Sequence, residues 1–359
     1  MTKIRIGIIG FAQMHITTMA ETFLALPDRF EFIGCADTPC TLKPTSTQPG
    51  TRLGTKAAVE KLCFPIPLYA NYQDLLNARP DLIIVTCENS LHGMVVTQAL
   101  EMGIHVILEK PMATSIQDAL QMQEAARRKG CLLMVNWPTT WMPAFRRAQE
   151  LAAAGTVGNI VRFTYSNAES IGPFSYGQSI TDAEKLEECW YQRNLGGGSP
   201  IDYIGYGCIL SRWFLGQRAV SATAIARNLM ADFADIEDHA TVILNYPSAH
   251  AVLDATWSTF SAGGIPSGPV VYGEKGTIVT DKKSGITRVY TERFAQKPEV
   301  VFENDQLPAG RDSLALEFLH GLEQGDVHPT LSVDLNMDAM AAMDAALRSI
   351  HSGKTENIA

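Results

Sequence analysis

The chain begins with a regular alternation of apolar runs and amphipathic segments. Apolar runs typical of buried strands occupy 4–9, 31–37, 80–86, 105–109 and 131–136, with a shorter one at 66–70. Segments such as 16–26, 55–63 and 91–102 look helical, and in 16–26 and 91–102 the apolar residues recur at three- and four-residue spacing. Strands that alternate with helices through short connections form parallel sheets. We therefore expect a doubly wound α/β sheet of the Rossmann type, with 131–136 as its sixth strand.

The pattern changes after residue 136. Helices are expected at 143–154, 200–215, 313–325 and 335–352, and strands at 160–167, 241–246, 251–257, 270–273, 276–280 and 287–290. The sequence therefore predicts two domains. Residues 1–135 form the Rossmann domain, and residues 136–359 form an α+β domain with a large, mostly antiparallel sheet.

Composition narrows the class of protein. The chain has 359 residues, of which 46% are hydrophobic and 19% charged, enough to bury a sizeable core. The net charge of −9, with no basic cluster beyond 127–129, argues against nucleic acid and membrane surfaces as partners. The cysteines lack a Cys-x-x-Cys pair, and no apolar run approaches the roughly 18 residues of a membrane span. The N-terminus resembles a strand and not a signal peptide, so we expect a cytoplasmic protein.

The first two strands end in residues suited to a dinucleotide. Gly10, Phe11 and Ala12 form the turn into the first helix, where a Rossmann fold places the pyrophosphate. The glycine fingerprint is degraded, because Ala12 takes the second glycine position and His15 the third; His15 either contacts the cofactor or starts the helix. Asp37 ends the second strand and either binds the ribose hydroxyls or caps the turn before Pro39. No arginine immediately follows Asp37, which favours NAD over NADP.

A lysine follows the strand at 105–109. Ligands of open α/β sheets bind outside the carboxyl ends of the strands, so Lys110 is placed to point into that crevice. More commonly, a lysine in such a position lies on the surface, before a proline in a loop. The neighbouring segments decide between the two readings.

Two segments carry a resemblance to a known family. Residues 87–92 (CENSLH) and the complete motif Glu109-Lys110-Pro111 resemble the glucose–fructose oxidoreductase / inositol dehydrogenase / MocA (Gfo/Idh/MocA) family. The family's usual Thr-Pro-Asn-x-x-His is here Cys87-Glu88-Asn89-x-x-His92, so Asn89 and His92 match. The resemblance implies that Lys110 lies by the nicotinamide and the substrate hydroxyl. It also implies that Asn89 and His92 border the cofactor crevice, although His92 could equally pack on the sheet.

The resemblance extends to the second domain. Gly196-Gly197-Gly198 precedes a helix on which Asp202 and Tyr206 are four residues apart and share one face. The family pattern has a histidine where this chain has Tyr206, which resembles the glucose–fructose oxidoreductase branch and the dihydrodiol dehydrogenases. The alternatives to a functional role are that Asp202 is an aspartate favoured at a helix N-terminus and that Tyr206 is a half-buried tyrosine. The polar segment 170–188 is either a loop over the site or an ordinary surface loop.

These residues predict an NAD(P)-dependent dehydrogenase that acts on CH–OH groups of a sugar, polyol or related ring. The catalytic residues are Lys110, Asp202 and Tyr206: Tyr206 as general acid/base, Lys110 as the charge that favours its phenolate, and Asp202 as the orienting group. The cofactor-binding residues are Gly10, Phe11, Ala12, Asp37, Cys87, Asn89, His92, Glu109, Lys110 and Pro111, and no metal site is assigned. A redox-silent NAD-binding regulator and an NAD-dependent glycosidase without net redox change remain alternatives. The family implies a homodimer or homotetramer that pairs through the C-terminal sheet.

Overall fold

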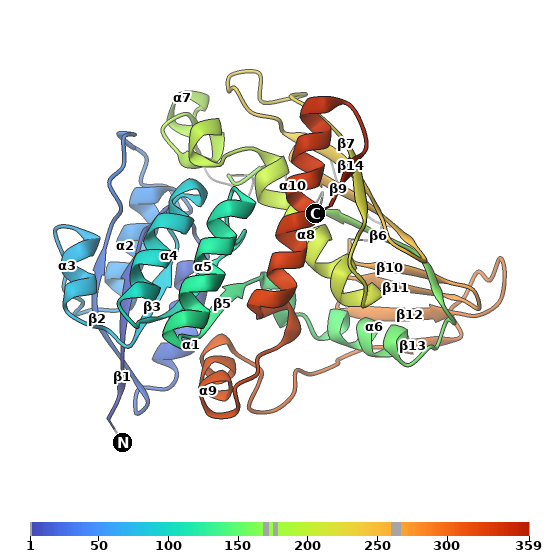
Figure 1. The fold of residues 1–359 in the computed structure, drawn as a ribbon, viewed down its shortest axis with the longest axis horizontal. Helices are drawn as coiled ribbons and strands as arrows, with labels where there is room; N and C mark the ends of the chain where they lie inside the picture. The colour runs from blue at the N-terminus through green and yellow to red at the C-terminus, as the bar shows by residue number, and fades with distance from the viewer. Residues whose placement is uncertain (1, 168–171, 175–178, 260–266, 359) are drawn as a thin grey trace.

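The computed structural model describes residues 2–167, 172–174, 179–259 and 267–358 (Figure 1). Its N-terminal part is a parallel sheet of five strands in the order β2-β1-β3-β4-β5. The strands are β1 (Ile4–Ile9), β2 (Phe30–Ala36), β3 (Leu82–Val85), β4 (His105–Glu109) and β5 (Leu133–Asn136). The intervening helices are α1 (Ile16–Leu24), α2 (Arg52–Leu62), α3 (Tyr72–Asn77), α4 (His92–Glu101) and α5 (Ile116–Lys129). The predicted Rossmann-type sheet is confirmed.

One predicted strand of this sheet is wrong. Residues 66–70 make a single bridge, between Leu68 and Cys35, and form no strand. Cys35 donates to the Pro67 carbonyl at 2.9 Å and accepts from Tyr69 at 2.8 Å, and the ladder ends there. Pro65 and Pro67 lack the N–H groups that a longer ladder would need. The run 131–136 is therefore the fifth strand and not the sixth.

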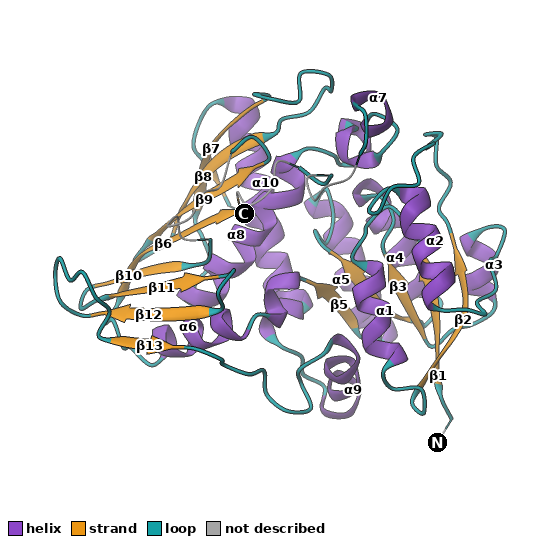
Figure 2. Ribbon diagram, turned by 180° about the vertical axis from the view of Figure 1, so that it is seen from behind, coloured by secondary structure: helices purple, strands orange, loops and turns teal. Residues whose placement is uncertain are grey.

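The C-terminal part is built on a nine-stranded sheet in the order β13-β12-β11-β10-β6-β9-β8-β7-β14 (Figure 2). Its strands are β6 (Ile160–Asn167), β7 (Ser221–Arg227), β8 (His239–Asn245), β9 (His250–Thr256), β10 (Val270–Gly273), β11 (Thr277–Asp281), β12 (Ile286–Tyr290), β13 (Val300–Phe302) and β14 (Glu356–Asn357). All neighbours pair antiparallel except β6 and β9, which pair in parallel. The mostly antiparallel sheet is confirmed.

Helices cover one face of this sheet. They are α6 (Pro143–Ala153), α8 (Ser199–Leu215) and α10 (Val333–Ser352), while α9 (Leu314–Gln324) packs beside α1 on the Rossmann side (Figure 1). The polar segment 170–188 contains the short helix α7 (Asp182–Lys185), whereas residues 170–171 and 175–178 of that predicted loop lie outside the described residues. The helix α8 matters most for function, because it begins at the glycine run and carries Asp202 and Tyr206.

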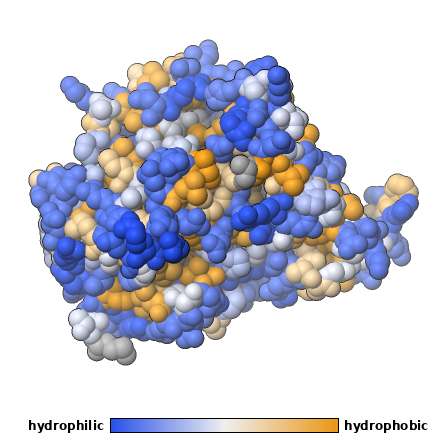
Figure 3. Space-filling model, in the orientation of Figure 1, coloured by the Kyte–Doolittle hydropathy of each residue, from blue (hydrophilic) through white to orange (hydrophobic). Residues whose placement is uncertain are grey.

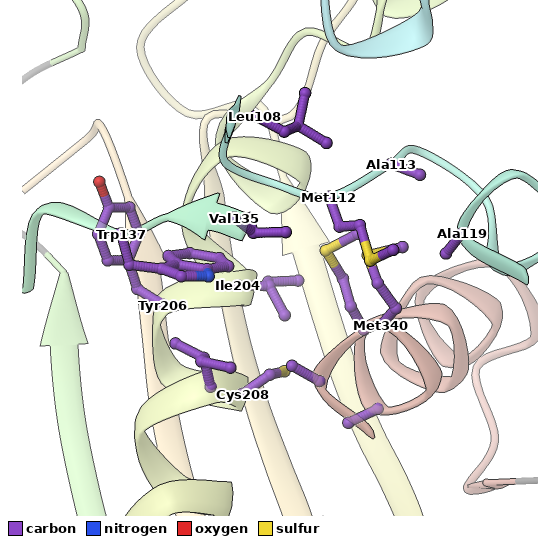
Figure 4. Close-up of a cluster of buried hydrophobic side chains, with 14 of the residues drawn as sticks. Leu108, Met112, Ala113, Ala119, Val135, Trp137, Ile204, Tyr206, Cys208 and Met340 are labelled. Carbon is purple, nitrogen blue, oxygen red and sulfur yellow. The ribbon is translucent and has the colours of Figure 1, made fainter. Parts of the chain in front are cut away.

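A shared core joins the two sheets. One cluster of buried side chains runs from Val135 on β5 to Trp137, and on to Ile204 and Tyr206 on α8. Figure 4 shows Trp137 and Tyr206 side by side, with Met112 and Met340 on the far side of Ile204. The rings of Trp137 and Tyr206 meet edge to face, 5.0 Å between centroids. The core therefore holds α8 against the carboxyl end of the parallel sheet.

The surface is mainly polar. On the face drawn in Figure 3, hydrophilic side chains predominate and the apolar ones form small, separate patches. Among the described residues, no helix has the length and apolar character needed to cross a membrane.

Candidate active site

The carboxyl end of β4 and the first turns of α8 meet at a buried ion pair. Lys110 follows β4 directly, and its ammonium contacts Oδ1 of Asp202 on α8. The side chains are only 2% and 5% exposed, so water screens the pair little. The structure thus brings together the lysine of one predicted domain and the aspartate of the other.

Aromatic rings surround this pair. The Lys110 ammonium lies 5.2 Å from the ring centroid of Tyr206 and 5.8 Å from that of Trp190. These residues border a cavity of about 170 Å³, which we call the catalytic cavity. It is lined by Met14, His15, Lys110, Pro138, Thr139, Met142, Asn167, Gly172, Pro173, Trp190, Asp202, Tyr203, Tyr206 and Lys282. The predicted catalytic residues therefore share one small cavity with aromatic walls.

Lys110 is held in its charged form. Burial acts to lower its pKa, but the carboxylates of Asp202 and Glu109 outweigh burial and raise the pKa above the ordinary value of a lysine. An ammonium can donate hydrogen bonds to a substrate oxygen and can stabilise negative charge there. It cannot take up a proton, so Lys110 is not the base of this site.

The phosphate turn is shaped as a Rossmann turn should be. Gly10 has φ of +90°, and a Cβ at this position would lie 2.4 Å from the Cα of Cys87. Only glycine allows so close an approach of the two chain segments. Beyond the turn, Ala12 packs in a hydrophobic cluster with Phe174, Trp190 and other residues of the second domain, which therefore lies over the turn.

Asn89 ties three segments together beside the turn. Its side-chain oxygen accepts a hydrogen bond from Gln13 at 3.0 Å, and its nitrogen donates to the carbonyl of Gly196 at 2.9 Å. A Cβ at Gly196 would lie 2.8 Å from the Cβ of Asn89, which explains the glycine run at this contact. The run thus lets the second domain approach the sheet edge.

His92 is fully buried at the start of α4. Its ring nitrogens lie 2.9 Å from the Pro111 carbonyl oxygen and 3.3 Å from that of Cys87, and burial lowers its pKa. The ring therefore joins the loops that follow β3 and β4. Contact of His92 with a cofactor stays a prediction.

An arginine that the sequence did not single out holds Asp37. Arg52, the first residue of α2, donates to both carboxylate oxygens of Asp37, at 2.7 and 2.9 Å, and to Glu88 at 2.5 Å. Glu88 also accepts from the Thr38 hydroxyl at 2.7 Å. Burial raises the pKa of Asp37, and the attraction of Arg52 offsets this only in part. No arginine immediately follows Asp37 in the sequence, but Arg52, 15 residues further on, contacts it in the structure.

The second domain adds a third carboxylate to this group. Both oxygens of Glu188 lie 3.1 Å from the backbone nitrogen of Arg52, and the side chain is buried. Beside it, Glu187 accepts from the backbone and hydroxyl of Thr45. We call Asp37, Arg52, Glu88 and Glu188 the arginine cluster.

Glu188 should make stability depend on pH. Burial raises its pKa from 4.5 to about 7, so between these values the unfolded chain releases a proton that the folded chain keeps. The contribution of Glu188 to the free energy of unfolding is therefore fully present below about pH 4.5. It falls by roughly 1–3 kcal/mol as the pH rises to 7. We expect Glu188→Gln to remove this fall in urea unfolding, and Glu187→Gln to keep it. Equal pH dependence in the wild type and Glu188→Gln would contradict the assignment.

The residues at this edge fit a dinucleotide in their chemistry. Helix α1 begins at Ile16, six residues after Gly10, so its N-terminus follows the turn where a Rossmann fold binds the diphosphate. Two buried oxygens, Oε1 of Gln13 and Oε2 of Glu109, have no hydrogen-bond partner among the described residues, and ribose hydroxyl or carboxamide N–H groups would satisfy them. The sequence analysis did not identify Gln13, Arg52 or Glu188. The one available signal was Glu88, because a charged residue within a buried segment requires a partner.

The chain has relatives among named dehydrogenases and reductases. The chain is 29% identical over 203 residues to scyllo-inositol 2-dehydrogenase (NADP(+)) IolU of Bacillus subtilis, covering 56% of this chain and 57% of the relative. It is 23% identical over 320 residues to 1,5-anhydro-D-fructose reductase of Ensifer adhaerens, covering 88% and 89%. The matches to IolU and to an uncharacterized oxidoreductase, C115.03, of Schizosaccharomyces pombe span 57% and 62% of those proteins, less than two thirds of their length.

Solved structures share the fold. An oxidoreductase from Thermotoga maritima superposes with a TM-score of 0.77 at 19% identity, covering 99% of this chain and 100% of its own. Aldose-aldose oxidoreductase from Caulobacter crescentus, complexed with glycerol, superposes with a TM-score of 0.76 at 20% identity, covering 99% and 100%.

Family models match both halves of the chain. Residues 4–137 match the model described as oxidoreductase family, NAD-binding Rossmann fold, and residues 145–279 match the GFO/IDH/MocA C-terminal domain. Residues of both matched ranges line the catalytic cavity, among them Lys110 from the first and Asp202 and Tyr206 from the second. The chain belongs to the Gfo/Idh/MocA family of oxidoreductases.

Proposed function

We propose that this protein transfers a hydride between a nicotinamide cofactor and a secondary hydroxyl or carbonyl group of a sugar, polyol or related ring compound. The observation that carries the proposal is the buried Lys110–Asp202 pair, which opens on a small cavity with aromatic walls. The names of the relatives, which include inositol and anhydrofructose enzymes, support this substrate class.

The residues have complementary roles in this reaction. The nicotinamide, when bound, accepts or supplies the hydride. Lys110 donates a hydrogen bond to the reacting oxygen and stabilises negative charge on it, while Asp202 holds Lys110 in place. Tyr206 exchanges the hydroxyl proton with the substrate, and Trp190 closes the cavity against water.

The cofactor is held along the edge of the parallel sheet. Gly10, Phe11 and Ala12 receive the diphosphate, Asp37 the adenosine ribose, and Glu109 the nicotinamide end. In the arginine cluster one guanidinium faces the two carboxylates of Asp37 and Glu88, so a 2′-phosphate there would meet excess negative charge. We therefore propose NAD as the cofactor in preference to NADP.

One set of measurements tests activity and cofactor together. Fluorescence titration should give a lower Kd for NADH than for NADPH, and incubation of NAD with a panel of sugars and polyols should produce NADH. Tight NADH binding without any turnover would favour a redox-silent regulator. Release of sugar from glycosides without net NADH would favour the NAD-dependent glycosidase.

We also propose that the free face of the nine-stranded sheet pairs two copies of the chain. Apolar side chains on its strands are well exposed, among them Ile225 at 65% and Ile243 at 41%. Light scattering of the purified protein tests this, and a monomer at micromolar concentration would contradict it.

A further inference from the structure

The catalytic cavity contains an imidazole that the roles above leave unused. His15, at the N-terminal end of α1, lines this cavity together with Lys110, Asp202 and Tyr206. Its Nδ1 lies 2.8 Å from Oε1 of Glu109, the residue before Lys110. Glu109 is completely buried, whereas the His15 side chain is 31% exposed. A buried carboxylate thus fixes an imidazole that reaches water.

His15 also borders a second cavity. This outer cavity, of about 280 Å³, shares His15 and Pro138 with the catalytic cavity and is lined further by exposed residues such as Thr18 and Asp312. The catalytic residues are much less accessible, since as whole residues Lys110 is 2% exposed, Asp202 4% and Tyr206 7%. His15 is therefore the imidazole that connects these buried groups with the solvent side.

Other histidines do not serve this purpose. His92 is buried with both ring nitrogens against backbone carbonyls. Position 206, where the family pattern has a histidine, is a tyrosine in this chain. Among the described residues that line the catalytic cavity, His15 is the sole imidazole.

We propose that His15, oriented by Glu109, carries the substrate's hydroxyl proton between the catalytic cavity and solvent. The inference rests on the proposed dehydrogenase function and adds the path of the proton. When the alcohol is oxidised, the bound nicotinamide would supply the hydride acceptor for its carbon, and its oxygen loses a proton to the phenolate oxygen of Tyr206. That proton then passes to Nε2 of His15, and the imidazolium beside Glu109 releases it to water in the outer cavity. Reduction of a carbonyl runs in the opposite direction.

The charges around His15 suit this cycle. Besides His15, the ionisable groups that line the two cavities are Lys110, Asp202, Tyr203, Tyr206, Lys282 and Asp312, and Glu109 contacts His15 directly. Asp202 already pairs with Lys110, and Glu109 stabilises the imidazolium directly, as a buried carboxylate does in other His–carboxylate pairs. Because Nδ1 faces Glu109, Nε2 is left to exchange protons.

Kinetics of His15→Gln test the proposal with the sugar or polyol that turns over fastest. We expect kcat to fall by about 10²-fold, the acid limb of the pH profile of kcat/KM to disappear, and added imidazole to restore much of the rate, while the Kd for NADH stays unchanged. The control is His320→Gln, which removes another histidine–carboxylate pair, with Asp326, remote from both cavities; it should behave as the wild type. Unchanged turnover in His15→Gln, or a loss in KM or Kd alone without rescue, would overturn the proposal.

A measurement without cofactor or substrate separates this inference from the proposed function. In protein labelled with ¹⁵N-histidine, neutral His15 should be protonated at Nδ1, and this preference for Nδ1 should weaken in Glu109→Gln. Failure of every sugar to turn over would refute the proposed function and leave this NMR result to stand by itself. A neutral form protonated at Nε2, or a tautomer indifferent to Glu109→Gln, would overturn the pairing on which the proton path depends.

Discussion

Lys110→Met should reduce kcat by about 10²-fold or more while the Kd for NADH stays near that of the wild type. Methionine fills a similar volume and keeps the contacts with the rings of Trp190 and Tyr206, but it removes the ammonium that lies 5.2–5.8 Å from their centroids. Without the ammonium, nothing in the described cavity stabilises the substrate oxygen in the same place. Steady-state kinetics with the best sugar or polyol measures the effect.

The matched control is Lys282→Met, since Lys282 lines the same cavity but lies on the turn after β11. It should retain most of the turnover if the effect depends on position and not on the charge of the cavity as a whole. Because Lys110→Met leaves Asp202 buried without its partner, Lys110→Met/Asp202→Asn should recover stability but not activity. Turnover near wild type in Lys110→Met would refute the assigned role.

The sequence predicted the Rossmann half well because its signals are local. Near-continuous apolar strands, separated by helices with three- and four-residue spacing, allow few other arrangements. The position of Lys110 follows from the same pattern, because a residue just after a parallel strand must lie at the ligand-binding edge. Its partner Asp202 lies 92 positions further along the sequence, and this pairing was expected only through the family resemblance.

Strand β7 was not predicted, because the alternation of apolar and polar residues along it is weak. Strand β7 has the sequence SATAIAR, in which small alanines take the buried positions, so its alternation carries little hydrophobic contrast. Residues 66–70 show the converse case, since their apolar side chains suggested a strand that two prolines limit to one bridge. Neither error affects the site, because both segments lie away from the catalytic cavity.

Side-chain networks were the main limit of sequence reasoning. Arg52 lies 15 residues beyond Asp37, in a segment whose helical start gives no sign that its side chain turns back to the sheet. Glu88 stands where the family pattern has proline, and a buried carboxylate in that place requires a cation. The requirement could be stated from the sequence, but which of 29 lysines and arginines meets it could not.

Arg52→Met should lower the free energy of unfolding by about 3–5 kcal/mol at pH 8. The arginine side chain is 6% exposed, and its removal leaves Glu88, 1% exposed, and Asp37 without their cation. Buried charges that lose their partner are costly because neither water nor another donor replaces it. The loss should be smaller at pH 5, where protonation can relieve the repulsion. Urea unfolding at both pH values measures the difference.

Two further variants distinguish this cause from a loss of packing. Arg52→Met/Glu88→Gln should recover part of the lost stability, because the second change removes the buried charge that the first leaves unpaired. Arg127→Met, which breaks a pair with Glu124 at 74% exposure of the arginine, should change stability by no more than about 0.5 kcal/mol. If the double variant were as unstable as the sum of its single changes, the arginine cluster would not be an electrostatic unit. The proposed preference for NAD depends on an excess of carboxylates that act on one another. It would then lose its basis.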